Sequence, residues 1–148
     1  MIDSKVTKRF AENLPLIRKA VGWTAEELGN KVDVKRQTIM SIEKKEQITV
    51  PMYLAIRTQL ETEIELHPEE NEMVKVALDA FVDNPDKYGE KDKEEIKKEI
   101  TLLSPALRVN ENERKDVSNK WKALIALSVS AAVLSTIASI AIGAWRKK

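Results

Sequence analysis

Residues 24–45 read TAEELGNKVDVKRQTIMSIEKK, and the rest of the chain is organised around this stretch. Thr24 is a favourable helix N-cap, and Glu27 stands three residues later, where it completes a capping box. Leu28 and Val32 follow as an apolar pair at i, i+4 spacing. The first half of the stretch therefore predicts a short amphipathic helix.

The second half of the stretch predicts another helix after a tight turn. The apolar stripe breaks at Asp33-Val34, and Lys35–Lys45 then places Ile39 and Ile42 on one face. The other faces of this second helix carry polar residues, among them Arg36, Gln37, Ser41 and Lys44. We expect its polar face to be free to bind a ligand.

The pattern resembles the XRE (Cro/repressor-like) helix-turn-helix family over about residues 10–60. The resemblance is carried by Gly22-Trp23-Thr24, Leu28, Val34 and Ile39-x-x-Ile42-Glu43. Four positions depart from the family pattern, namely Gly29 in place of Ala, Asp33 in place of Gly, Lys45 in place of Gly, and Ala25 in place of a phosphate-binding Gln. The resemblance implies a small DNA-binding bundle.

The resemblance also implies roles for individual residues. Base edges in the major groove would be read by Arg36, Gln37 and Ser41, while Lys35, Thr38 and Lys44 would lie toward phosphates. Arg18 and Glu43 would form a structural ion pair between the first helix and the recognition helix.

Apolar periodicity completes an all-α bundle over residues 1–68. Lys5 to Val21 carries one apolar stripe and ends at Gly22, but Pro15 favours a helix that begins near Leu14, with a separate turn or kinked extension before it. Pro51 suits the start of a helix to about Leu60 or Leu66, which would bury Leu54, Ile56 and Leu60.

Composition limits the remaining functions. The 148 residues are 43% hydrophobic and 33% charged, which allows one small domain with appendages. No cysteine is present, the only histidine is His67 in a polar turn, and no glycine-rich phosphate loop occurs. Met1–Phe10 is polar and does not resemble a signal peptide. We therefore predict neither an enzyme nor a metal or cofactor site.

Residues 69–103 form a predicted acidic helical region. A first helix near Asn71 to Val82 carries an apolar stripe that either extends the bundle or pairs with another subunit. A second helix, Glu90 to Leu103, has only a narrow apolar stripe, so its charged surface is either a solvated face or a site for a protein partner. Residues 104–120 are polar and predict a linker.

The C-terminal segment predicts a single membrane-spanning helix over residues 121–146. Ala123 to Trp145 contains 23 residues without a charge. As one helix it would be about 34 Å long at ~1.5 Å per residue, against a bilayer core of about 30 Å. Trp121 and Trp145 would lie at the two interfaces, next to basic residues. Removal of residues 121–148 is then expected to leave the bundle folded.

Small residues recur at every fourth position of this segment, as Ala131, Ser135, Ser139 and Gly143. Such a face allows two helices to approach closely and predicts a homodimer. The DNA-binding bundle places the N-terminal part in the cytoplasm of a bacterial cell, as a single-pass membrane protein.

Two functions remain open from the sequence. The first is a membrane-anchored transcription regulator that binds double-stranded DNA with Lys35–Lys45. The second is an adaptor that resembles RodZ-like proteins, in which the helix-turn-helix bundle binds a protein partner in place of DNA. The basic and polar residues of Lys35–Lys45 favour the first.

Overall fold

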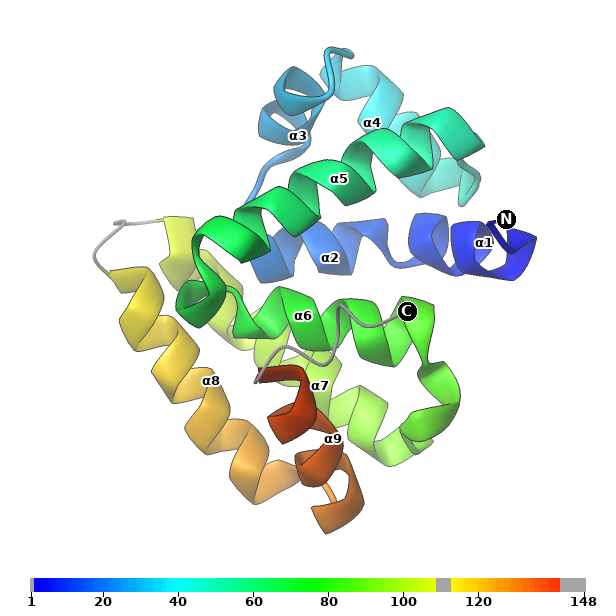
Figure 1. The fold of residues 1–148 in the computed structure, drawn as a ribbon. Helices are drawn as coiled ribbons and strands as arrows, with labels where there is room; N and C mark the ends of the chain where they lie inside the picture. Colours follow the sequence, from blue (N-terminus) through cyan, green and yellow to red (C-terminus); the bar gives the residue numbers. More distant parts are fainter. Residues whose placement is uncertain (1, 109–112, 142–148) are drawn as a thin grey trace.

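The computed structural model describes residues 2–108 and 113–141, and every regular element among them is helical (Figure 1). The predicted all-α class is therefore confirmed. The N-terminal helices are α1 (Ser4–Glu12), α2 (Leu14–Val21), α3 (Ala25–Lys31), α4 (Arg36–Lys45) and α5 (Val50–Leu66). They form the predicted bundle, whose core contains Phe10, Leu14, Ile17, Leu28, Ile39, Ile56 and Leu60, all at most 1% exposed.

The ends of these helices follow local sequence signals. α2 begins at Leu14, as Pro15 predicted, and α1 is a separate helix before it. Gly22 ends α2 in the left-handed conformation at φ 83°, which favours glycine. One core prediction is wrong, because Leu54 is 47% exposed.

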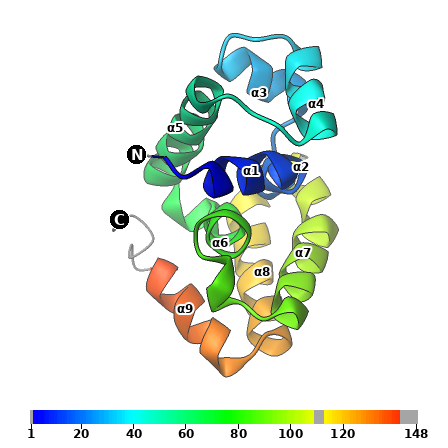
Figure 2. The same cartoon turned by 90° about the vertical axis from the view of Figure 1, so that its right-hand side faces the viewer.

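The second half of the chain is built around α6 (Glu72–Leu78), which continues as the π-helical turn η2 (Asp79–Asp83). Short 3-10 turns and three longer helices accompany it, namely η1 (Pro68–Glu70), η3 (Pro85–Lys87), α7 (Glu90–Leu103), η4 (Ser104–Arg108), α8 (Arg114–Ser128) and α9 (Ala131–Ala141). Figure 2 shows α6 nearly end-on, below α1 and α2, with α7, α8 and α9 around its other sides.

Residues 71–80 are buried without exception, as expected for a helix that is covered on all sides. The stripe that includes Met73, Val74, Ala77 and Leu78 is at most 3% exposed within the chain itself. This stripe therefore extends the core of the chain, which is the first of the two arrangements that the sequence left open. α7 has the predicted bounds of Glu90 and Leu103.

The segment predicted as a linker, residues 104–120, is largely helical. Its first part is η4, residues 109–112 lie outside the described part, and Arg114 to Lys120 form the first half of α8. Val117 and Ser118 are buried, because α8 packs along α7 and α6. The linker prediction failed because polar residues here form the exposed face of a packed helix.

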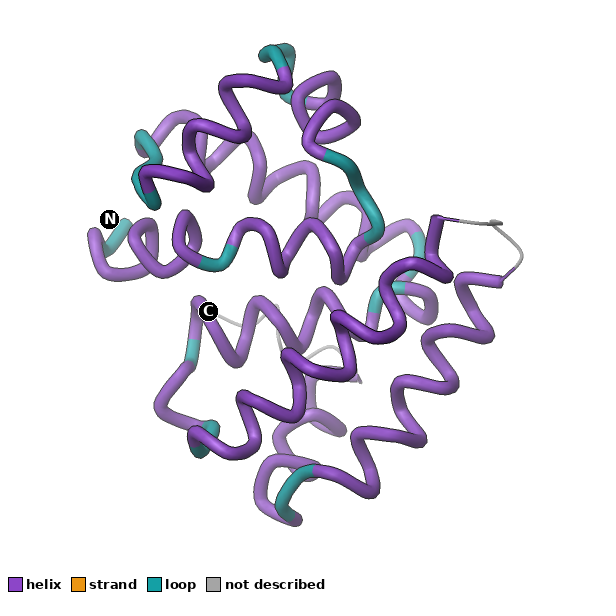
Figure 3. Tube along the Cα trace, turned by 180° about the vertical axis from the view of Figure 1, so that it is seen from behind, coloured by secondary structure: helices purple, strands orange, loops and turns teal. Residues whose placement is uncertain are grey.

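The apolar C-terminal segment is divided between two helices in the described residues. α8 ends at Ser128, Val129 is extended at ψ 164°, and α9 begins at Ala131 (Figure 3). Ser130 stabilises the non-helical connection between α8 and α9, because its backbone N–H and its hydroxyl each donate to the Asp92 carboxylate at 3.0 Å. The predicted continuous helix over residues 121–146 is therefore not formed, and its last residues lie outside the described part.

Within the described ranges, no helix combines the length and the apolar character needed to cross a membrane. The inner faces of α8 and α9 instead pack onto α6. Their contribution to the core is Trp121, Ile125, Val133 and Ile140, each at most 3% exposed.

Candidate nucleic-acid interface

The turn between α3 and α4 is closed by a short backbone contact. Asp33 adopts a left-handed conformation at φ 59°, and the Val34 N–H donates to the Gly29 carbonyl at 2.8 Å. A Cβ atom on Gly29 would lie 2.6 Å from the Val34 carbonyl oxygen, which is closer than packed atoms approach. Glycine at position 29 thus permits the close turn that sets the direction of α4.

The N-terminus of α3 has the predicted capping box. The Glu27 N–H donates to the Thr24 hydroxyl at 3.0 Å, and the Thr24 N–H donates to the Glu27 carboxylate at 2.8 Å. The second bond and the Arg108 guanidinium, 3.0 Å away, lower the pKa of Glu27. Arg108 therefore holds η4 against α3. The sequence predicted that Arg108 lies in a linker, because a contact between residues this far apart in the chain leaves no local sequence signal.

The far end of α4 is held by the ion pair that the family resemblance implied. Arg18 Nε lies 2.5 Å from one Glu43 oxygen and Nη2 lies 2.9 Å from the other. Arg18 also donates to the Trp23 carbonyl at 3.2 Å, so one side chain joins α2, the start of the helix pair and α4. Both partners are partly buried, which suits a role in orienting helices.

The candidate DNA-binding residues gather on the outer side of α4. Lys35 occupies the N-cap position of α4 in an extended conformation, without a capping bond from its side chain. The exposed residues are Lys35, Arg36, Gln37, Thr38 and Lys44. Within the described part of the chain, the side chains of Lys35, Arg36, Gln37 and Lys44 make no hydrogen bond or ion pair. Ser41 is half-buried and lies beside Ile42 along a groove with Thr49 and Met52. The exposed residues form a polar surface with net positive charge.

A further cation lies near this surface. Lys31, in the last turn of α3, sits 4.7 Å from the centre of the Trp23 ring. A cation over an aromatic face is held without a carboxylate partner, so its charge remains uncompensated. The sequence analysis did not single out Lys31, because Trp23 precedes α3 and Lys31 is its last residue, a spacing that carries no local signal for a contact.

The predicted dimerisation face lies elsewhere. Ala131, Ser135 and Ser139 are exposed on α9, and Gly143 lies outside the described residues. Ser135 and Ser139 line a pocket that also borders α1 and α5. The structure thus keeps these three residues on one helix face, but that face borders the chain's own bundle.

No metal centre is evident in the described part of the molecule, where no group of three or more His, Asp or Glu side chains has the required arrangement. His67 is half-exposed and contacts Glu70 at 3.6 Å.

In comparisons with known proteins, no family model, curated protein or solved structure matches the chain.

Proposed function

We propose that this protein is a sequence-specific regulator that binds double-stranded DNA through α4, in the manner of the XRE family. The observation that carries the proposal is the outward N-terminal face of α4, where Lys35, Arg36 and Gln37 are exposed and make no bond to the described chain. Unpaired donors of this kind meet phosphates and base edges without first losing an internal partner.

The arrangement of α4 supports distinct roles along the helix. Arg36 and Gln37 would read bases in the major groove, because Arg pairs with guanine and Gln with adenine. Ser41, one turn further on, would complete the base contacts, and Lys35, Thr38 and Lys44 would contact phosphates. Lys31 adds positive charge beside the α3–α4 turn.

One helix-turn-helix covers one half-site, so this function calls for a two-fold dimer with recognition helices about 34–36 Å apart. A homodimer through the Ala131, Ser135 and Ser139 face requires α9 to turn away from the pocket that Ser135 and Ser139 now border. Light scattering on the full chain, with and without palindromic DNA, measures whether the dimer forms.

The DNA proposal is tested by titrating the full chain against genomic fragments in a competitive gel shift. Specific fragments should bind about 10³-fold more tightly than bulk DNA, which is the lower end for specific recognition. Equal affinity for all fragments, abolished by moderate salt, would contradict sequence-specific recognition and favour the adaptor, whose helix-turn-helix bundle binds a protein in place of DNA.

Attachment to a membrane is a second part of the proposal, and the outward faces of α8 and α9 support it. Leu127 is 88% exposed and is surrounded along these helices by exposed alanines, at positions 123, 126, 131, 132 and 138. A spanning state requires α8 and α9 to leave α6 and join into one helix. In this membrane-spanning state the N-terminal bundle would lie in the cytoplasm, where DNA is present.

Membrane attachment is tested by flotation of the full chain with phospholipid vesicles. The parent should float with the vesicles, and Leu127→Lys should reduce flotation because a charge in the bilayer costs about 2.5–3.5 kcal/mol. Asn119→Lys, on an exposed turn of α8 before the apolar segment, is the matched control. A parent that stays at the bottom of the gradient would refute the attachment.

A further inference from the structure

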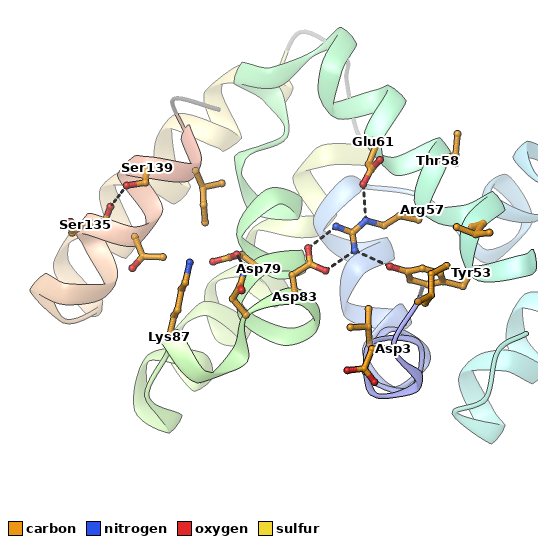
Figure 4. Close-up of a pocket in the computed structure, with 16 residues that line it drawn as sticks. Asp3, Tyr53, Arg57, Thr58, Glu61, Asp79, Asp83, Lys87, Ser135 and Ser139 are labelled. Atoms are coloured by element: carbon orange, nitrogen blue, oxygen red, sulfur yellow. Dashed lines mark hydrogen bonds and ion pairs between the residues drawn. The ribbon is translucent and has the colours of Figure 1, made fainter. Parts of the chain in front are cut away.

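A pocket of about 810 Å³ lies between the N-terminal bundle and the C-terminal helices. One side of it is formed by α5 and by the start of the chain as far as α1, and the other side by η2, η3 and α9 (Figure 4). The lining contains none of the proposed DNA contacts, so the role of this pocket is separate from DNA binding.

Apolar side chains on the α1–α5 side of the pocket are incompletely covered. Leu54 of α5 lines the pocket and is 47% exposed. Ile2 and Val6 line the same side and are only partly buried where they pack against the core. These three residues form an apolar strip, and a segment that covered the strip would remove its surface from water, which is favourable.

The described part of the chain ends at this pocket. α9 ends at Ala141, and the two residues before it, Ser139 and Ile140, line the pocket. Residues 142–148 read IGAWRKK and lie outside the described residues. Because four residues span up to about 13–14 Å, Trp145 comes within reach of the opposite side of the pocket.

The chemistry of this last segment matches the α1–α5 side. Trp145 has a large apolar ring, and the three residues after it are all basic. Carboxylates line the pocket beside the apolar strip, at Asp3 and Glu61. Within the described residues the Asp3 carboxylate accepts only from a backbone N–H, at 2.9 Å, which does not cancel its charge. The Glu61 side chain is 38% exposed and is therefore open to a second cation besides Arg57.

We propose that residues 142–148 occupy this pocket of their own chain. The Trp145 ring would cover the apolar strip, and the three basic residues would lie toward Asp3 and Glu61. They would keep away from Lys87, which Figure 4 shows on the η3 side of the pocket. The docked segment would join the end of α9 to α1 and α5, and so hold α9 in the packed arrangement.

The covalent attachment favours this occupant over a free ligand of similar chemistry. A segment on a short tether has an effective concentration of roughly millimolar at a site within its reach. The tether here begins in the lining itself, at Ile140. The segment would therefore fill the pocket before a free ligand that binds less tightly than this concentration requires.

A double-mutant cycle on the full chain, without lipid, tests the contact of Trp145 with the apolar strip. Leu54→Ala and Trp145→Ala should each raise the unfolding equilibrium constant measured in urea. The double variant should fall short of the product of the two effects by at least about twofold, because each change removes the partner of the other. Leu66→Ala is the matched control, since Leu66 is 67% exposed on the same helix but does not line the pocket, and it should combine with Trp145→Ala without coupling.

Paired cysteines test the position of the segment directly, because the chain has no cysteine of its own. Ala144→Cys is combined with Thr58→Cys, whose position is exposed and lines the pocket. Mild oxidation should close this pair within one chain at least about tenfold faster than Ala144→Cys with Leu66→Cys, which lies about 12 Å further along α5. Adding Trp145→Ala should remove the difference. Non-reducing gels and mass spectrometry measure both rates.

Three outcomes would overturn the proposal. Independent effects of Leu54→Ala and Trp145→Ala would show that the ring does not cover the apolar strip. Equal oxidation rates for the Thr58 and Leu66 pairs would show that the segment has no preferred position at the pocket. Disulfides that form only between two chains would assign the pocket to the segment of a second copy.

Discussion

At the scale of single residues, Gly29 shows how the helix pair depends on one absent side chain. Alanine normally stabilises a helix by about 1 kcal/mol relative to glycine. Here its Cβ would meet the Val34 backbone oxygen at 2.6 Å, and backbone has little room to yield. We expect Gly29→Ala to destabilise the protein by about 1–3 kcal/mol.

The measurement for this change is urea unfolding followed by circular dichroism. Asn30→Ala is the control, since Asn30 is the next residue of α3 and is exposed. A Gly29→Ala protein that is more stable than the parent would mean that the α3–α4 turn opens at small cost.

The residues of α4 make a second prediction at this scale, which rests on the proposed DNA binding. Arg36→Ala should reduce affinity for the preferred sequence by about 1–3 kcal/mol and relax the choice at one base pair. Lys44→Ala should weaken binding to all sequences and lower the salt dependence by about one counterion.

Fluorescence anisotropy of labelled DNA over a series of salt concentrations distinguishes the effect of Arg36→Ala on sequence preference from the effect of Lys44→Ala on salt dependence. Lys98→Ala removes an exposed lysine from α7 and should leave both quantities unchanged. If Arg36→Ala and Lys44→Ala behave identically, α4 contacts only phosphates.

At the scale of elements, α8 decides whether the apolar C-terminal segment belongs to the core. Trp121 is fully buried, while Leu127 on the same helix is 88% exposed. Trp121→Ala should cost about 3–5 kcal/mol of unfolding free energy, and Leu127→Ala should change it by less than about 0.5 kcal/mol. Guanidinium unfolding measures both, and equal effects would mean that α8 does not pack on α6 in solution.

At the scale of the whole molecule, the two halves share one core. Arg57 joins α5 to Asp83, Arg9 Nε donates to the Val82 carbonyl at 2.8 Å, and Arg114 donates to the Val21 carbonyl. α6 packs on α2 as well as on α7, α8 and α9. We therefore expect a single cooperative unfolding transition for the parent protein.

Removal of residues 121–148 should destroy that cooperativity, in contrast to the expectation from the sequence that the bundle would stay folded. The deletion uncovers α6, since it takes away Trp121, Ile125, Val133 and Ile140. Thermal unfolding and binding of a hydrophobic dye report the loss. A truncated chain that melts as sharply as the parent would show that the N-terminal bundle folds alone.

Local signals were sufficient to predict the helix pair, its capping box, the stop at Gly22 and the bounds of α7, because caps, glycine and apolar periodicity act over a few residues. The candidate DNA-binding residues follow from the same short stretch.

Local signals did not predict that polar residues before Trp121 continue a packed helix, or that the 23 uncharged residues divide at Ser130. A helix that faces α6 and a helix that faces lipid have similar apolar composition, and only tertiary contacts such as the Asp92–Ser130 bonds distinguish them. The pocket likewise exists only in three dimensions, since its walls come from four separate parts of the chain.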